Sequence, residues 1–152
     1  MNEILFVAIM GMVLAQLIKF PIYYLKHGKV YPPIILSTGS MPSSHTSFVV
    51  SLATAVGISS GTNSAVFAVA VVFAMITLHD AVKVRGESGK QAVVINELVL
   101  MVDELGQSIN PKNDRAVRQD KLKTLIGHTG SEVLAGLILG LVWPLIYFLL
   151  VK

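Results

Sequence analysis

The sequence predicts an all-α integral membrane protein, a bundle of about four transmembrane helices plus one amphipathic helix in the membrane interface. Hydrophobic residues make up 53% of the chain, charged residues only 14%, and the mean hydropathy is +0.69. The uncharged run at 133–151 would span roughly 28 Å as a helix, close to the thickness of a bilayer core. We therefore expect a single membrane-embedded domain over residues 1–152.

The other three apolar segments are residues 4–18, 47–58 and 65–78. The first does not read as a signal peptide, because Glu3 stands where a basic region is expected and no small-residue cleavage site follows. The second and third are short for membrane spans and contain polar residues. We expect both to face protein more than lipid, and to form a hairpin through the uncharged turn at 59–64.

An amphipathic helix is predicted between Gly89 and Gly106. Glu97, Asp103 and Glu104 interrupt its apolar positions, which is typical of a helix that lies in the membrane interface. The following segment, 110–123, is basic and reads as a loop.

The basic residues predict the orientation in the membrane. Eleven of the twelve Lys and Arg residues lie between the first and second spans or between the third and last, and only Lys152 lies on the other side. The positive-inside rule makes the basic side cytoplasmic. We expect a bacterial plasma-membrane protein whose polar motifs, at 39–45, 84–91 and 127–132, all meet at that surface.

The stretch GSMPSSHTSF, residues 39–48, predicts a polar helix start. Pro42 favours an abrupt beginning, and Ser43 or Ser44 can cap the helix, leaving backbone N–H groups that bind anions such as phosphate. His45 in the first turn could donate a proton to a departing oxygen. The alternative is a capped helix whose histidine only sits at the headgroup level.

A second polar motif, at 127–132, precedes the last span. If His128 is helical, Glu132 lies one turn away and could orient it as a nucleophile toward phosphorus. Alternatively, Thr129 and Glu132 form a capping box. A metal site built on His128 and Glu132 ranks last because no third ligand is evident, so no metal is expected. Cysteine is absent, which excludes thiolate nucleophiles.

Basic partners for a phosphate are Lys19, which ends the first span, and Arg85, which follows the third. Arg85 would offer a fork of donors and Lys19 a point charge. The alternative for both is snorkelling to lipid headgroups. A charged Asp80 carboxylate at the end of an apolar helix is energetically costly unless it forms an ion pair. Lys83 and Arg85 are its expected partners.

These motifs, in this order, resemble the divergent branch of the type 2 phosphatidic acid phosphatase and vanadium haloperoxidase superfamily. The resemblance covers nearly the whole chain. It implies that Ser43 and Ser44 bind phosphate with Lys19, that His45 is the general acid, and that Glu132 orients the nucleophile His128. It also implies a second polar wall of the same pocket, made of Asp80, Arg85, Lys90, Gln91 and Asn96.

The chain departs from the superfamily pattern at several positions. Ser44 stands in place of a glycine, Glu132 in place of an aspartate, and Leu122 where an arginine is expected, while no Arg-Pro pair follows Lys19. The departure at Leu122 keeps a non-catalytic alternative open, in which the protein binds or carries a lipid phosphate without turning it over.

The predicted function is hydrolysis of a lipid phosphomonoester or pyrophosphate through a phosphohistidine, without metal or cofactor. Phosphatidylglycerophosphate, phosphatidate and polyprenyl diphosphates are candidate substrates. Membrane lipids are the expected partners, and nucleic acid is not expected. Gly136 and Gly140 form a small-xxx-small pair that could pack helices within one chain or between the chains of a homo-oligomer.

Overall fold

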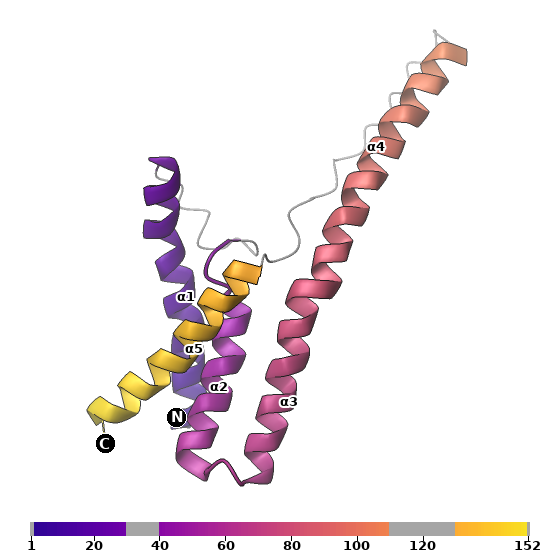
Figure 1. Cartoon of the computed structure of the whole chain (residues 1–152). Coiled ribbons are helices and arrows are strands. Elements are labelled where there is room, and N and C mark those ends of the chain that lie inside the picture. The colour runs from indigo at the N-terminus through magenta and orange to yellow at the C-terminus, as the bar shows by residue number, and fades with distance from the viewer. Residues whose placement is uncertain (1, 30–39, 110–129, 152) are drawn as a thin grey trace.

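The computed structural model describes residues 2–29, 40–109 and 130–151, and nearly all of these residues are helical (Figure 1). The elements, in chain order, are α1 (Glu3–His27), α2 (Ser44–Ser60), α3 (Ala65–His79), the π-helical segment η2 (Asp80–Val84), α4 (Arg85–Ile109) and α5 (Gly130–Val151). The described part of the chain contains no strand. The all-α membrane fold predicted from composition is therefore confirmed.

Local sequence signals explain where the first helices begin and end. The Asn2 side chain accepts hydrogen bonds from the N–H groups of Ile4 (3.0 Å) and Leu5 (3.3 Å), which caps α1. Gly28 ends α1 in the left-handed conformation at φ 64°, where a side chain would be strained. Ser64 caps α3 by accepting from the N–H of Phe67 at 3.2 Å, so the predicted turn after α2 is confirmed.

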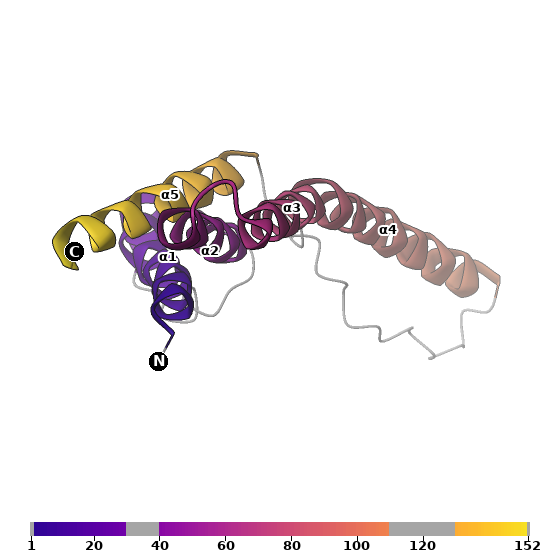
Figure 2. The same ribbon diagram turned by 90° about the horizontal axis from the view of Figure 1, so that it is seen from below.

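Helix α2 occupies the centre of the bundle and packs against α1, α3 and α5. Figure 2 shows α1, α2 and α5 gathered together, with α4 extending beyond them. Small and hydroxyl-bearing residues fill the buried face of α2, among them Ser47, Ser51, Ala53 and Ala55. The expectation that this segment faces protein is confirmed.

Close approach between the central helices depends on glycine. A Cβ on Gly136 would lie 2.5 Å from the Ser43 carbonyl oxygen, and a Cβ on Gly140 would lie 2.7 Å from the Val50 Cβ. The two glycines lie one turn apart on one face of α5, so this small-xxx-small pair packs α5 against α2 of the same chain. Gly11 has the same role on α1, where the Ser47 hydroxyl donates to its carbonyl oxygen at 2.8 Å.

Helix α3 does not follow the expectation that it faces protein. Ala70 and Ala74 are its buried residues, whereas most of its large apolar side chains are exposed and would meet lipid. The expectation was wrong for this helix because lipid solvates large apolar side chains as well as protein does, so only the small residues need to face α2.

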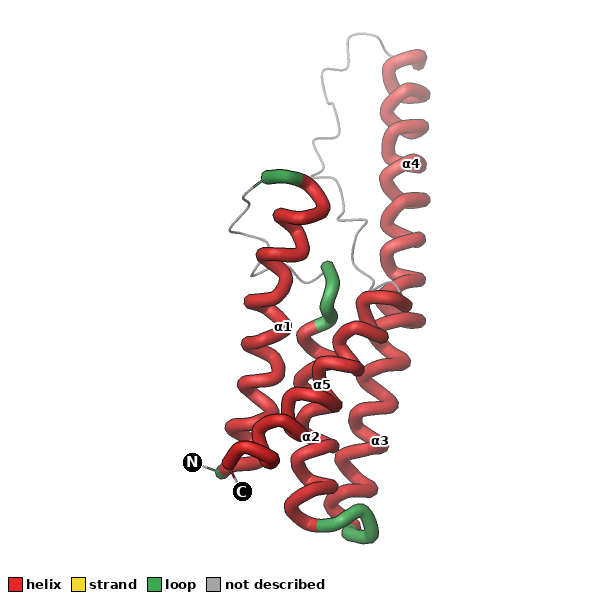
Figure 3. Tube along the Cα trace, turned by 60° about the vertical axis from the view of Figure 1, so that its left-hand side comes forward, coloured by secondary structure: helices red, strands yellow, loops and turns green. Residues whose placement is uncertain are grey.

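Three helical stretches of the described residues are long and apolar enough to cross a membrane: Glu3–Lys26, Ala65–Gly106 and Gly130–Val151. The 17 residues of α2 are shorter than these spans and lie among them. The chain does not break between the third apolar segment and the predicted amphipathic helix, since α3 continues through η2 into α4 (Figure 3). At about 1.5 Å per residue this rod is about twice as long as a bilayer core is thick, so part of it lies outside the core. That α4 lies in the interface stays a prediction.

The helix order places the starts of α2 and α5 at one end of the bundle. Both termini and the α2–α3 turn lie at the opposite end, and α2 and α5 begin near each other (Figure 1). The terminal end is held by aromatic residues: the Trp143 indole N–H donates to the Val7 carbonyl oxygen at 3.0 Å, and the Trp143 and Tyr147 rings lie 5.9 Å apart. The starts of α2 and α5, with the polar residues that they carry, lie at the other end of the bundle (Figure 1).

Candidate functional site

The candidate site is built where α2 and α5 begin. The backbone N–H of Ser43, the residue that caps α2, donates to the backbone carbonyl oxygen of Glu132 in the first turn of α5 at 3.0 Å. Glu132 lies one turn before Gly136 and two turns before Gly140, so the same close packing fixes its position. The two polar motifs found in the sequence are thus in direct contact.

The hydroxyl of Ser43 is oriented by Thr46. It accepts from the Thr46 backbone N–H at 3.4 Å and from the Thr46 hydroxyl at 3.0 Å, and both residues are fully buried. A hydroxyl has two acceptor positions and one proton, so the remaining capacity of Ser43 is donation. The predicted cap at Ser43 is confirmed.

Lys19 adds a positive charge to the same end of the bundle. Its residue is only 1% exposed, and the Glu132 carboxylate lies close enough to act on its ammonium group electrostatically. It continues the buried stripe of α1 that runs through Ala8, Gly11 and Ala15. Because Lys19 is enclosed by the bundle, snorkelling to the headgroups does not describe it.

The two predicted catalytic histidines differ in what the structure describes. His45 is the second residue of α2 and is exposed, next to the buried Ser44. His128 and Thr129 lie outside the described residues, and α5 is described from Gly130 onward. Whether the half-buried Glu132 orients His128 or closes a capping box stays a prediction.

Asp80 and Arg85 flank the π-helical segment. Asp80 opens η2 and is half-buried, and η2 packs against α5, which brings the end of α3 to the same end of the bundle as Glu132. π-Helical turns inside α-helices often occur at functional sites. Arg85 begins α4 immediately after this turn.

The remaining predicted residues lie on α4, beyond the bundle. Lys90 is exposed and forms an ion pair with Glu87 at 2.8 Å, Gln91 is exposed, and Asn96 is half-buried. Asn96 lies 16 residues after Asp80, about 24 Å along a helix. The structure does not gather these three residues with Lys19 and Ser43, and their predicted place in the pocket stays a prediction.

Sequence reasoning missed Thr46 and Gln16. Thr46 is three residues after the cap, where a hydroxyl can reach the capping side chain, so its position was a usable signal. Gln16 lies one turn before Lys19 on α1, and its Oε1 atom is buried with no hydrogen-bond partner among the described residues. An amide inside an apolar span, three residues before a lysine and so on the same helix face, also indicated a polar site.

A metal site is not evident in the described part of the chain. Within residues 2–29, 40–109 and 130–151, no group of three or more His, Asp or Glu side chains is placed to hold a metal ion. The site that the described residues do build has a buried ammonium, a donor hydroxyl and a helix start, all of which suit an anion.

Comparison with known proteins agrees with a membrane protein. The model of the Divergent PAP2 family matches residues 1–143, and the chain belongs to this family. A relative from Bacillus subtilis (strain 168), described as the uncharacterized membrane protein YuiD, is 39% identical over 138 residues, which cover 90% of this chain and 87% of the relative. No solved structure matches the chain.

Proposed function

We propose that the protein is a lipid phosphate phosphatase that works without a metal ion, through a phosphohistidine. The observation that carries the proposal is the junction of Lys19, Ser43 and Glu132, which lie far apart in the sequence and meet at one end of the bundle. Lys19 and Ser43 each lie near Glu132, and an ammonium group and a hydroxyl are groups that can donate hydrogen bonds to a phosphate. Membership of the Divergent PAP2 family supports the same chemistry.

The proposed reaction has two steps. In the first, an imidazole nitrogen of His128 attacks phosphorus in line, the bond from phosphorus to the leaving oxygen breaks, and His45 gives that oxygen its proton. In the second, water attacks phosphorus while His45 takes one of its protons, the bond from phosphorus to the His128 nitrogen breaks, and inorganic phosphate leaves. Lys19, Arg85, Ser43 and Ser44 would hold the phosphate oxygens, and Glu132 would orient His128.

The proposed substrate is a phosphate or pyrophosphate of a membrane lipid, because the site lies at the end of membrane-spanning helices. The basic segments between the spans carry eleven of the twelve Lys and Arg residues, which supports a site that faces the cytoplasm. Phosphatidylglycerophosphate, phosphatidate and polyprenyl diphosphates present such groups at that surface.

A second candidate is a protein that binds or carries a lipid phosphate without hydrolysing it. Leu122 stands where the superfamily pattern has an arginine, and this favours binding without turnover. The pair His45 and His128 favours hydrolysis, because binding an anion needs donors but not a nucleophile and a separate acid.

The test is phosphate release by the purified protein in detergent with EDTA, using the three lipid phosphates named above. We expect release from at least one of them by the wild type, and a loss of at least about 10³-fold in His128→Ala, as found when a nucleophile is removed. His79→Ala is the matched control, because His79 ends α3 at the same end of the bundle and has no proposed role. Retained release in His128→Ala would refute the mechanism, and binding without release by the wild type would favour the carrier.

A further inference from the structure

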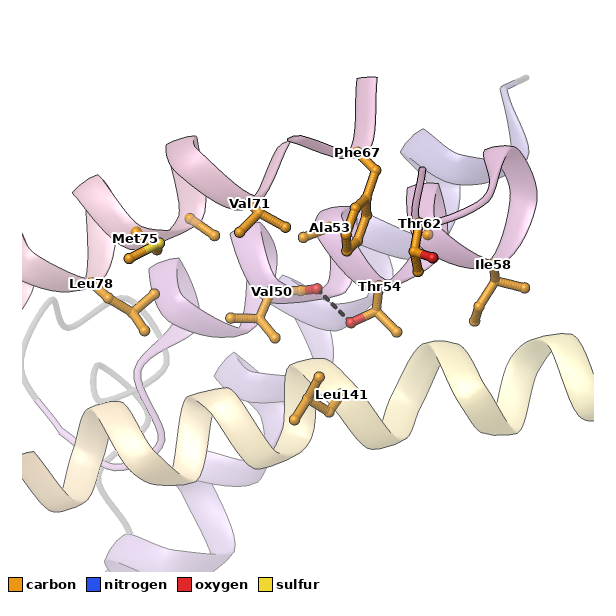
Figure 4. Close-up of a pocket in the computed structure, with 12 residues that line it drawn as sticks. Val50, Ala53, Thr54, Ile58, Thr62, Phe67, Val71, Met75, Leu78 and Leu141 are labelled. Carbon is orange, nitrogen blue, oxygen red and sulfur yellow. Dashed lines mark hydrogen bonds between the residues drawn. The ribbon is translucent and has the colours of Figure 1, made fainter. Parts of the chain in front are cut away.

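An open apolar groove of about 460 Å³ runs between α3 and α5, and α2 forms its floor. Val50 and Ala53 line it from α2, Val71 and Met75 from α3, and Leu141 from α5. Figure 4 shows Leu141 facing the α2 and α3 side chains across this space. The groove belongs to the part of the bundle that crosses the membrane, so its open side would face lipid.

The lining of the groove offers little to a polar ligand. Thr54 lies in the floor, but its hydroxyl donates to the Val50 carbonyl oxygen at 2.8 Å, so its proton is used within α2 (Figure 4). The other hydroxyl of the lining belongs to Thr62, which lies at the α2–α3 turn, so a polar group placed along the rest of the groove would lose its water without gaining a partner. Hydrocarbon is the chemistry that this lining favours.

The dimensions of the groove suit one alkyl chain. Its α3 wall runs from Phe67 to Leu78, about 16 Å along a helix and roughly half the thickness of a bilayer core. At ~30 Å³ per water-sized group, its volume holds about fifteen methylenes.

The groove is aligned with the candidate site. Leu78, at one end, is two residues before Asp80 and the π-helical segment. Val50, in the floor, lies two turns after Ser43 along α2 and beside Gly140 on α5. At the other end, a Cβ on Gly57 would lie 2.9 Å from the Phe67 ring, so this ring lies against Gly57 near the α2–α3 turn.

We propose that this groove holds one alkyl chain of the lipid whose phosphate binds beside Ser43 and Lys19, and that it selects for chain length. The proposal rests on the proposed function for the position of the phosphate. A chain that begins at the polar end would run along α2 toward Phe67. Each added methylene strengthens binding until the groove is full, and further methylenes add little.

The test measures binding of octyl, dodecyl, hexadecyl and eicosyl phosphate to the purified protein by native mass spectrometry. For the wild type, we expect affinity to rise with chain length and then level off. Val71→Phe fills part of the groove, so affinity should level off at a shorter chain, and hexadecyl phosphate should bind about tenfold more weakly, the loss expected from about two methylenes. Val66→Phe is the matched control, because Val66 is an exposed valine of α3 that does not line the groove.

Identical chain-length profiles for Val71→Phe and Val66→Phe would overturn the proposal. A change of oligomeric state in Val71→Phe, with lipid binding unchanged, would also overturn it and would assign the groove to contact with a second copy. Phosphate release is measured on the same samples. If the wild type releases phosphate but shows no chain-length preference, the proposed role of the groove is refuted and the phosphatase proposal stands. If binding depends on chain length but no phosphate is released, the phosphatase proposal is refuted and the role of the groove stands.

Discussion

Helices α2 and α3 are neighbours in one hairpin, yet they differ in how much of their surface is buried. The buried face of α2 is made of Ser, Thr, Ala and Val side chains, and it contacts three other helices. Helix α3 is more hydrophobic, but among its residues only Ala70 and Ala74 are buried, and Val69, Met75 and Ile76 are more than 60% exposed. In a membrane, the most hydrophobic helix is therefore not the one at the core of the bundle. Helices rich in small and hydroxyl-bearing side chains pack there instead.

The comparison also explains where the site lies. Helices α1 and α5 approach α2 closely because Gly11, Gly136 and Gly140 carry no side chains at the contacts. This close packing brings the backbone of Glu132 within hydrogen-bond distance of Ser43 and encloses Lys19. The polar site is thus a continuation of the small-residue packing around α2, whereas α3 contributes the apolar groove.

The largest expected effect comes from closing the space between α2 and α5. Gly136→Ala would place a Cβ 2.5 Å from the Ser43 carbonyl oxygen, so α5 must move, and we expect a loss of about 1–3 kcal/mol in stability together with weaker phosphate release. The measurement is the thermal midpoint in detergent. Gly106→Ala is the control: its Cβ meets nothing within 4 Å, and the change should be neutral or stabilising by about 0.5–1 kcal/mol. Equal midpoints for the two variants would contradict the packing.

A second pair of substitutions tests α2 against α3 directly. Val49 of α2 is 3% exposed and Val72 of α3 is 55% exposed. Val49→Ala should cost about 1–2 kcal/mol, because it leaves a space in a packed core. Val72→Ala should change stability by less than about 0.5 kcal/mol, since lipid or detergent takes the place of the lost methyl groups. If the two variants lower the thermal midpoint by the same amount, the proposed difference between α2 and α3 is wrong.

Much of this fold could be predicted from the sequence, because its signals are local. The cap at Ser43, the turn after α2 and the apolar spans each depend on a few neighbouring residues. The small-xxx-small pair at Gly136 and Gly140 also indicated close packing, but its partner helix could not be read from one segment. The continuous rod through η2 was missed because glycines and charges at 85–90 suggested a break, and none of them needs a positive φ there.

The candidate site was predictable in composition but not in arrangement. Lys19, Ser43 and Glu132 were singled out by type and position, yet only packing decides which of the basic residues is enclosed. Lys19 is enclosed because it continues the stripe of α1 that faces α2. Lys90 belongs to a helix that leaves the bundle, and the sequence motif that groups it with Asp80 does not contain that information.

A smaller effect is expected at a single hydrogen bond. The Ser47 hydroxyl joins α2 to α1 by donating to the Gly11 carbonyl oxygen at 2.8 Å. The Thr77 hydroxyl donates within its own helix, to Phe73 at 2.9 Å. Ser47→Ala should lower stability by about 0.6 kcal/mol, the average for an interhelical hydrogen bond in a membrane, and Thr77→Ala by less. A larger loss in Thr77→Ala would mean that α3 is held by more than its small residues.

The smallest effect is expected at Lys90, and here the contrast is with Lys19. The Lys90 side chain is 75% exposed and pairs with Glu87, whereas the Lys19 residue is 1% exposed beside Glu132. Solvent and detergent can replace what Lys90 contributes, so Lys90→Ala should leave the thermal midpoint and phosphate release unchanged within error. Lys19→Met should strongly reduce release, because Lys19 is the buried lysine among the described residues and is proposed to bind the phosphate. If Lys90→Ala reduces release as strongly as Lys19→Met, Lys90 must act at the phosphate site. Helix α4 would then have to bend at η2 toward the starts of α2 and α5 during the reaction. The second polar wall that the sequence motif implies would form only in that bent state.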